Sequence, residues 1–152
     1  MRISPQELIG ILKNFGDFDP SSFKDRLRAQ KIIYLLQSSG VPLGYSYSWY
    51  LHGPYSRQLA DDFFEGSNED VPILEFTDPR FEMALRHTMN LVEAKETRTV
   101  ELLGSLCFLA LFHPDLNKRE VIAELLEKKP KFGREEAESA WVSLRRNRLV
   151  SR

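Results

Sequence analysis

Cysteine is nearly absent from this sequence, since Cys107 is the one cysteine among 152 residues. A lone cysteine cannot form a disulfide within the chain, which excludes the class of disulfide-stabilised secreted scaffolds. Long hydrophobic runs are also missing, because the apolar run at 102–112 falls well short of the ~20 residues that cross a bilayer. Residues 1–7 contain no apolar stretch of the secretory type. We therefore expect a cytoplasmic protein without membrane association.

Metal-binding and nucleotide-binding motifs are absent as well. The three histidines, His52, His87 and His113, lie too far apart for an HxxxH or HxH metal spacing. The sequence contains no P-loop, no GxGxxG and no GxSxG. His52 and Tyr55 are the best candidates for a catalytic site, but no nucleophile or carboxylate pair is spaced to support them. We expect a protein that is not an enzyme and needs no metal and no cofactor.

Helix-start signals, by contrast, recur along the chain. Ser4-Pro5-Gln6-Glu7 is a capping box with proline in the first turn, and Asn117 with Glu120 repeats the pattern. Apolar residues follow these signals at helical spacing. The predicted fold class is mainly α: a compact bundle of six or seven helices with one short aromatic strand or hairpin. We expect a single domain over residues 1–152, with an N-terminal lobe at 1–65 and a helical lobe at 78–152.

Aromatic residues gather at 45–55, a segment that holds four of the five tyrosines and one of the two tryptophans. Alternation at 45–51 predicts a strand with one aromatic face, followed by a turn at 52–55. Tyrosine and tryptophan combine an apolar body with a polar tip, which suits a surface that is buried against a partner. Packing of that face on the helix that begins near Ser22 is the alternative. The partner-binding residues that we predict are Tyr45, Tyr47, Trp49, Tyr50, His52, Tyr55 and Arg57.

The sequence resembles a known signature in two stretches. They are Arg26-Leu27-Arg28-Ala29-Gln30-Lys31-Ile32-Ile33-Tyr34-Leu35-Leu36 and then Gly44-Tyr45-Ser46-Tyr47-Ser48-Trp49-Tyr50-Leu51-His52-Gly53-Pro54-Tyr55-Ser56. It is similar to the pattern KLQKLLYLLQ … F.WY.YGPYS..L of YwgA-like prokaryotic proteins, and more distantly to the Panacea domain of SocA-like antitoxins. The resemblance covers residues 22–64. The chain reads HGPY where the Panacea form commonly reads YGPV, which favours the YwgA-like branch.

This resemblance implies a helix-rich fold and, for Panacea-type relatives, neutralisation of a toxin by direct binding or action as an adaptor. We therefore expect a protein-interaction module whose partner is encoded by a neighbouring gene; its oligomeric state stays open, with a dimer as one option. The matching positions to which we assign a structural role are Gln30, Lys31, Tyr34, Gly53, Pro54 and Ser56. In particular, Gln30 is expected to satisfy backbone groups beside the aromatic strand, and Ser56 to cap the next helix.

The C-terminal segment supports an alternative function. Residues 117–152 predict a helix-turn-helix-like pair followed by a wing strand at 149–150, the arrangement of a winged-helix domain. From Lys118 onward, ten basic and six acidic residues give a net charge of +4, whereas the remaining eleven basic and sixteen acidic residues give −5. The alternative is therefore a DNA-binding regulator. Its predicted nucleic-acid contacts are Arg145, Arg146, Arg148 and Arg152.

Overall fold

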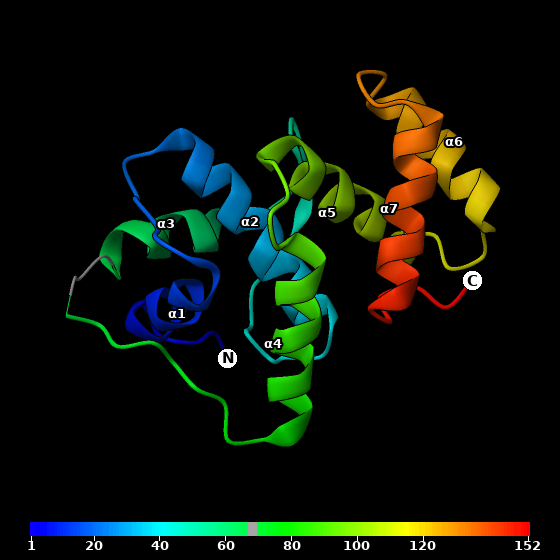
Figure 1. The fold of residues 1–152 in the computed structure, drawn as a ribbon. Helices are drawn as coiled ribbons and strands as arrows, with labels where there is room; N and C mark the ends of the chain where they lie inside the picture. The colour runs from blue at the N-terminus through cyan, green and yellow to red at the C-terminus, as the bar shows by residue number, and fades with distance from the viewer. Residues whose placement is uncertain (67–69) are drawn as a thin grey trace.

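The computed structural model describes residues 1–66 and 70–152 of the chain. Within these residues the chain forms seven α-helices and a two-stranded hairpin (Figure 1), which confirms the predicted fold class. The elements in chain order are α1 (Pro5–Leu12), the 3-10 helix η1 (Lys13–Phe15), α2 (Phe23–Ser38), β1 (Ser48–Tyr50), β2 (Gly53–Tyr55), α3 (Arg57–Glu65), α4 (Pro79–Val92), α5 (Thr97–Phe112), α6 (Lys118–Lys128) and α7 (Arg134–Arg146).

The predicted helix caps form as the sequence indicates. At the start of α1 the Ser4 hydroxyl accepts a hydrogen bond from the Glu7 N–H, and the Glu7 carboxylate accepts one from the Ser4 N–H. Asn117 and Glu120 make the same reciprocal pair at the start of α6. Each cap satisfies N–H groups that a helix end otherwise leaves without a partner.

Helix α2 contributes to two hydrophobic clusters. One cluster gathers on α5, α6 and α7 and includes Ile32 and Leu35 of α2. The other cluster joins α1 and α3 to Ala84 and Leu85 of α4, and it includes Ile33 and Leu36 of α2. Because successive residues of α2 face different clusters, the second half of this helix is buried nearly all round, as its sequence predicts.

The aromatic segment forms a hairpin instead of a strand followed by a turn. Strands β1 and β2 pair antiparallel, with Trp49 opposite Pro54, so residues 53–55 are a strand and the predicted turn at 52–55 is wrong. The reversal occurs at Leu51 and His52. Gly53 then follows with φ of +95°, a conformation that side-chain-bearing residues rarely adopt.

The predicted C-terminal helix pair is present, and both α6 and α7 pack against α5 (Figure 1). The predicted wing strand is not, because Leu149 and Val150 are buried as irregular chain and β1 and β2 are the only strands in the described residues. Among the helices of the described chain, none combines the length and the apolar character needed to span a membrane.

Candidate binding pocket

Two glutamines of α2 hold the aromatic segment at its two ends. The side chain of Gln30 donates to the Ser56 carbonyl (2.8 Å) and accepts from the Ser56 N–H (2.9 Å). Two helical turns later, Gln37 makes the same pair with the backbone of Tyr45, at 2.8 and 2.9 Å. The predicted role of Gln30 in satisfying this backbone is therefore confirmed. Ser56 in turn caps α3, since its hydroxyl accepts from the Leu59 N–H.

The aromatic side chains of residues 45–50 alternate between the core and the surface, although the strand predicted over 45–51 forms only at Ser48–Tyr50. Tyr45 is 4% exposed and its hydroxyl donates to the Asp62 carboxylate at 2.8 Å. Tyr47 packs edge-on against Tyr34, with ring centroids 4.9 Å apart. Burial raises the pKa of Tyr34, Tyr45 and Tyr47 well above the ordinary value of 10. Tyr45 is a core residue, so its prediction as a partner-contact residue is wrong.

Trp49 is half-buried on the same inward face. Its ring lies 5.7 Å from the Phe108 ring, and the Lys129 ammonium lies 5.6 Å from its centroid. Tyr50 points the other way: it is 55% exposed and its ring lies 5.3 Å from that of Tyr55. The outward face of the hairpin, rather than the inward face, is therefore the one available to a partner.

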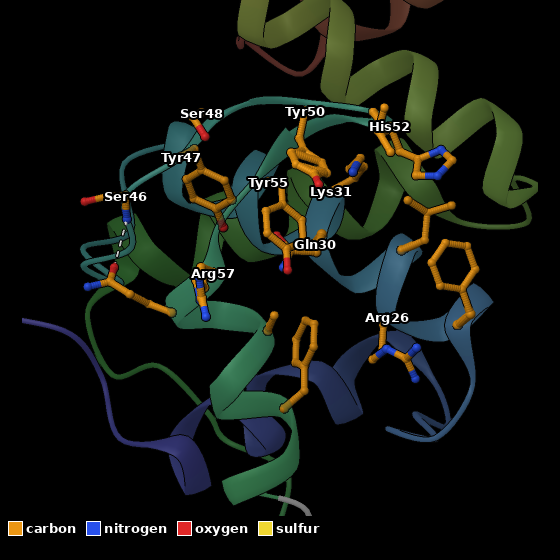
Figure 2. Close-up of a pocket in the computed structure, with 16 residues that line it drawn as sticks. Arg26, Gln30, Lys31, Ser46, Tyr47, Ser48, Tyr50, His52, Tyr55 and Arg57 are labelled. Atoms are coloured by element: carbon orange, nitrogen blue, oxygen red, sulfur yellow. Dashed lines mark hydrogen bonds between the residues drawn. The ribbon is translucent and has the colours of Figure 1, made fainter.

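An open pocket of about 880 Å³ lies between α2, the hairpin and α3 (Figure 2). Its lining residues are Phe23, Arg26, Leu27, Gln30, Lys31, Ser46, Tyr47, Ser48, Tyr50, Leu51, His52, Tyr55, Arg57, Gln58, Ala60 and Phe63. Five of the seven predicted partner-binding residues are among them. Figure 2 shows Arg57 and Arg26 on opposite sides of this pocket, with Tyr55 and Gln30 between them.

The pocket combines apolar surface with positive charge. The exposed side chains of Phe23, Tyr50 and Leu51 contribute to its lining, and Leu51 is 76% exposed. Arg26, Lys31 and Arg57 supply the cationic groups, and the described residues that line the pocket include no Asp or Glu. Large exposed apolar side chains around a concave site are typical of a binding surface, and the charge favours an anionic ligand.

Lys31 is the most buried of these cations. The residue is 1% exposed, and its methylene stem runs between two glycines. A Cβ on Gly104 of α5 would lie 3.1 Å from the stem, and a Cβ on Gly53 would lie 2.2 Å from the Ser105 hydroxyl. Both glycines are therefore needed for the close approach of α2, the hairpin and α5. Burial lowers the pKa of Lys31 to about 8, although Glu101 opposes the shift.

Glu101 of α5 organises the charges behind the hairpin tip. Its carboxylate is 2.9 Å from the ammonium groups of both Lys129 and Lys131, and Lys129 also donates to the Leu51 carbonyl. Burial acts to raise the pKa of Glu101, but the hydrogen bonds from the two lysines outweigh it and the pKa stays below the ordinary value. This buried ion pair ties the α6–α7 turn to the hairpin.

His52 lies at the edge of this charged group. Its Nδ1 is 4.0 Å from the Glu101 carboxylate, and its ring packs edge-on against Phe23 at 5.8 Å. Burial lowers the pKa of His52, with Glu101 opposing and the neighbouring lysines adding to the effect.

Our expectation that the chain is not an enzyme stays a prediction. In residues 1–66 and 70–152, no group of three His, Cys, Asp or Glu could hold a metal ion.

On the α2 side of the pocket, Gln30 and Lys31 were predicted from the sequence as structural residues only, and Phe23, Arg26 and Leu27 were not predicted as site residues. Phe23, Arg26, Leu27, Gln30 and Lys31 recur at spacings of three and four, so they share one face of the helix. That spacing is readable in the sequence, and combining it with the downstream aromatic segment would have identified the site.

The four C-terminal arginines are not equivalent. Arg145, Arg146 and Arg148 are exposed at the end of α7. Arg152 instead folds back, and its guanidinium donates to the carbonyls of residues 110, 113 and 116 at the end of α5. The Trp141 indole N–H donates to the Arg152 carbonyl at 2.6 Å. The prediction of Arg152 as a nucleic-acid contact is therefore wrong, because its Nε and Nη2 donors are used within the fold and hold the side chain against the end of α5.

Comparisons with known proteins add no assignment to this geometry. No protein-family model matches the chain, and neither a curated protein nor a solved structure matches it. The resemblance to YwgA-like and Panacea proteins therefore stays a prediction.

Proposed function

We propose that this chain is a protein-binding module, antitoxin-like or adaptor-like, that captures an acidic and apolar segment of a partner protein. The observation that carries the proposal is the open pocket between α2, the hairpin and α3, with its exposed aromatic side chains and its cationic groups. Aromatic and arginine side chains contribute most to protein–protein binding energy. The resemblance to Panacea-type proteins supports the same class of function.

The charges of the pocket support an acidic partner. Arg57 is exposed, and neither an ion pair nor a hydrogen bond engages its guanidinium among the described residues. The Arg26 guanidinium bonds a backbone carbonyl, that of Pro20, and lies 5.8 Å from the Phe23 ring centroid. Cations without carboxylate partners attract an anionic segment, and aromatic groups beside them favour apolar side chains in that segment.

Co-expression with the product of a neighbouring gene tests this proposal. The tagged chain is expected to retain that product through purification, whereas Tyr50→Ala and Arg57→Glu release it. Arg145→Glu is the matched control, because it reverses the charge of an exposed arginine on α7, away from the pocket. Loss of the partner in the control but not in the pocket variants, or no retained product at all, would contradict the proposal.

A further inference from the structure

We propose that the Lys31 ammonium group is the anchor for a carboxylate, carried by the bound segment next to an aromatic or aliphatic side chain. This inference rests on the proposed function, since it identifies the chemical group that the pocket recognises. It goes further because it assigns one atom, Lys31 Nζ, as the point of recognition.

The first support is the position of Lys31. The side chain is almost fully buried between α2, the hairpin and α5, yet it lines the pocket. Every other buried charged side chain in the described residues has a partner: Glu101 and Lys129 bond each other, and Asp62 accepts from Tyr45. The Lys31 ammonium group has no hydrogen bond and no ion pair within 4.0 Å in the described part of the chain. The buried side-chain atoms that lack a hydrogen-bond partner in the described residues are Tyr47 Oη and Ser105 Oγ. The unpartnered Lys31 ammonium is therefore not sealed in the core but reaches the open pocket, where a ligand can supply its partner.

The second support is the balance of charge around Lys31. Glu101 is the carboxylate whose charge acts on Lys31, and its two oxygens already accept hydrogen bonds from Lys129 and Lys131. Glu101, Lys129 and Lys131 together carry a net charge of +1, and Lys31 raises the net charge of the cluster to +2. His52 also faces this group and adds positive charge when protonated. The cluster therefore has an excess of positive charge that an anion would neutralise.

The third support is the character of the surrounding surface, which decides between kinds of anion. Gln30 is occupied with the Ser56 backbone, and Tyr50, Tyr55 and Leu51 present mainly apolar surface. A phosphate has three strongly accepting oxygens to satisfy, whereas the side chains just named bring mainly apolar surface to Lys31. A carboxylate attached to an apolar body fits both the charge and the lining.

The lowered pKa of Lys31, about 8, agrees with this geometry, because burial, together with the charges of Lys129 and Lys131, outweighs the opposing charge of Glu101. A bound carboxylate stabilises the protonated amine and is expected to raise that pKa toward the ordinary value of 10.5. Because the amine is increasingly neutral above pH 8 in the free protein, binding of a carboxylate is expected to weaken as the pH rises from 7 to 9.

The test uses the full chain labelled with ¹³C at lysine Cε, whose NMR signal reports protonation. Three short peptides share one aromatic, apolar sequence. The first is amidated and contains Glu, the second is amidated and contains Gln at that position, and the third contains Gln and ends in a free carboxylate. We expect the first or the third to shift the Lys31 signal and raise its pKa, and the second to leave both unchanged. The peptide that acts identifies a side chain or a chain end as the source.

Lys31→Met supplies the matched loss of function, with Lys24→Met as the control because Lys24 is exposed on the same helix. Loss of one charge-assisted hydrogen bond is expected to weaken carboxylate-peptide binding about tenfold or more. The Gln peptide is expected to bind both variants alike. The wild-type NMR titration needs no variant, so a folding defect in Lys31→Met does not remove the test.

Equal effects of the carboxylate and amide peptides, or an unmoved Lys31 signal with all three, would overturn the inference. If the partner protein still depends on Tyr50 and Arg57 in that case, the proposed function stands and the anchor alone is wrong. If partner binding ignores those two residues, the proposed function itself is wrong.

Discussion

The side chain of Gln30 forms two hydrogen bonds with the backbone of Ser56, one to its carbonyl at 2.8 Å and one from its N–H at 2.9 Å. Both residues are buried, and they join the middle of α2 to the point where the hairpin ends and α3 begins. The position of the pocket lining therefore depends on this pair, because α2, the hairpin and α3 are the three elements that form it.

Gln30→Ala is expected to lower the free energy of unfolding by about 1–3 kcal/mol. The substitution leaves the buried Ser56 N–H without its partner and removes one of two hydrogen bonds to the Ser56 carbonyl, which also accepts from the Ala60 N–H. Gln37→Ala is the matched control, because Gln37 makes the same pair of bonds to Tyr45 but is only partly buried. Urea unfolding should give a smaller loss for Gln37→Ala than for Gln30→Ala. Unchanged stability of Gln30→Ala, together with lost partner binding, would show that Gln30 acts in binding and not in the fold.

Gly53→Ala is expected to destabilise the protein by about 3 kcal/mol or more, because the new Cβ meets the Ser105 hydroxyl and the residue has a positive φ. Gly40 has a φ of +109° with open space around it, so Gly40→Ala measures the conformational cost alone, about 1–2 kcal/mol. Thermal unfolding of both variants separates the two causes. Ser105→Ala in the Gly53→Ala background should restore part of the loss, and equal destabilisation by the two glycine substitutions would refute the contact.

Lys31→Met is expected to stabilise the free protein at pH 7. The folded-state pKa of Lys31 is about 8 and its ordinary value is 10.5, which corresponds to about 3 kcal/mol of unfavourable charge burial as an upper figure. Between pH 8 and 10.5 the unfolded chain binds more protons at this residue, so wild-type stability gains from rising pH. The advantage of Lys31→Met over wild type should therefore shrink across that window in urea unfolding. An advantage that is constant with pH would contradict the shifted pKa.

Arg152→Ala is expected to lower the free energy of unfolding by about 1–3 kcal/mol, because the guanidinium bonds one carbonyl in the last turn of α5 and two in the chain that follows it. Arg145→Ala is the control, and its effect should stay within about 0.5 kcal/mol because the residue is exposed. Equal stability of the two variants in thermal unfolding would show that the Arg152 contacts contribute nothing.

The DNA-binding alternative has its own test at the end of α7. The proposed function predicts no mobility shift of duplex DNA by the chain at low salt. A shift that weakens with added salt and is lost in the triple variant Arg145→Ala, Arg146→Ala, Arg148→Ala would favour the regulator instead.

Local signals in the sequence predicted most of the helices. At Ser4, Ser56 and Asn117 the capping side chain accepts from an N–H three residues further along the chain, so the local sequence alone predicts the start of each helix. The hairpin was harder, since Pro54 favours a turn and its place opposite Trp49 depends on the packing of α2 and α5.

Only the hairpin side of the pocket could be predicted from the sequence, because the rest of the pocket depends on tertiary packing. The sequence indicated Tyr50, His52, Tyr55 and Arg57 because they lie close together in the chain. The unpaired state of Lys31 depends on Glu101 being occupied by Lys129 and Lys131, which lie about thirty residues further along. Arg152 was wrongly predicted as a nucleic-acid contact because an arginine near a chain end is expected to be exposed. In the structure, carbonyls at the end of α5 accept its hydrogen bonds.

The most direct measurement of the central claim is the dissociation constant of the purified complex between this chain and its co-expressed partner. It is measured at constant salt for wild type, Arg57→Glu and Arg145→Glu. We expect Arg57→Glu to weaken the complex about tenfold or more, because charge reversal places a carboxylate beside an acidic segment, and Arg145→Glu to leave the dissociation constant unchanged. Equal affinities for wild type and Arg57→Glu would contradict the assignment of the pocket as the binding surface.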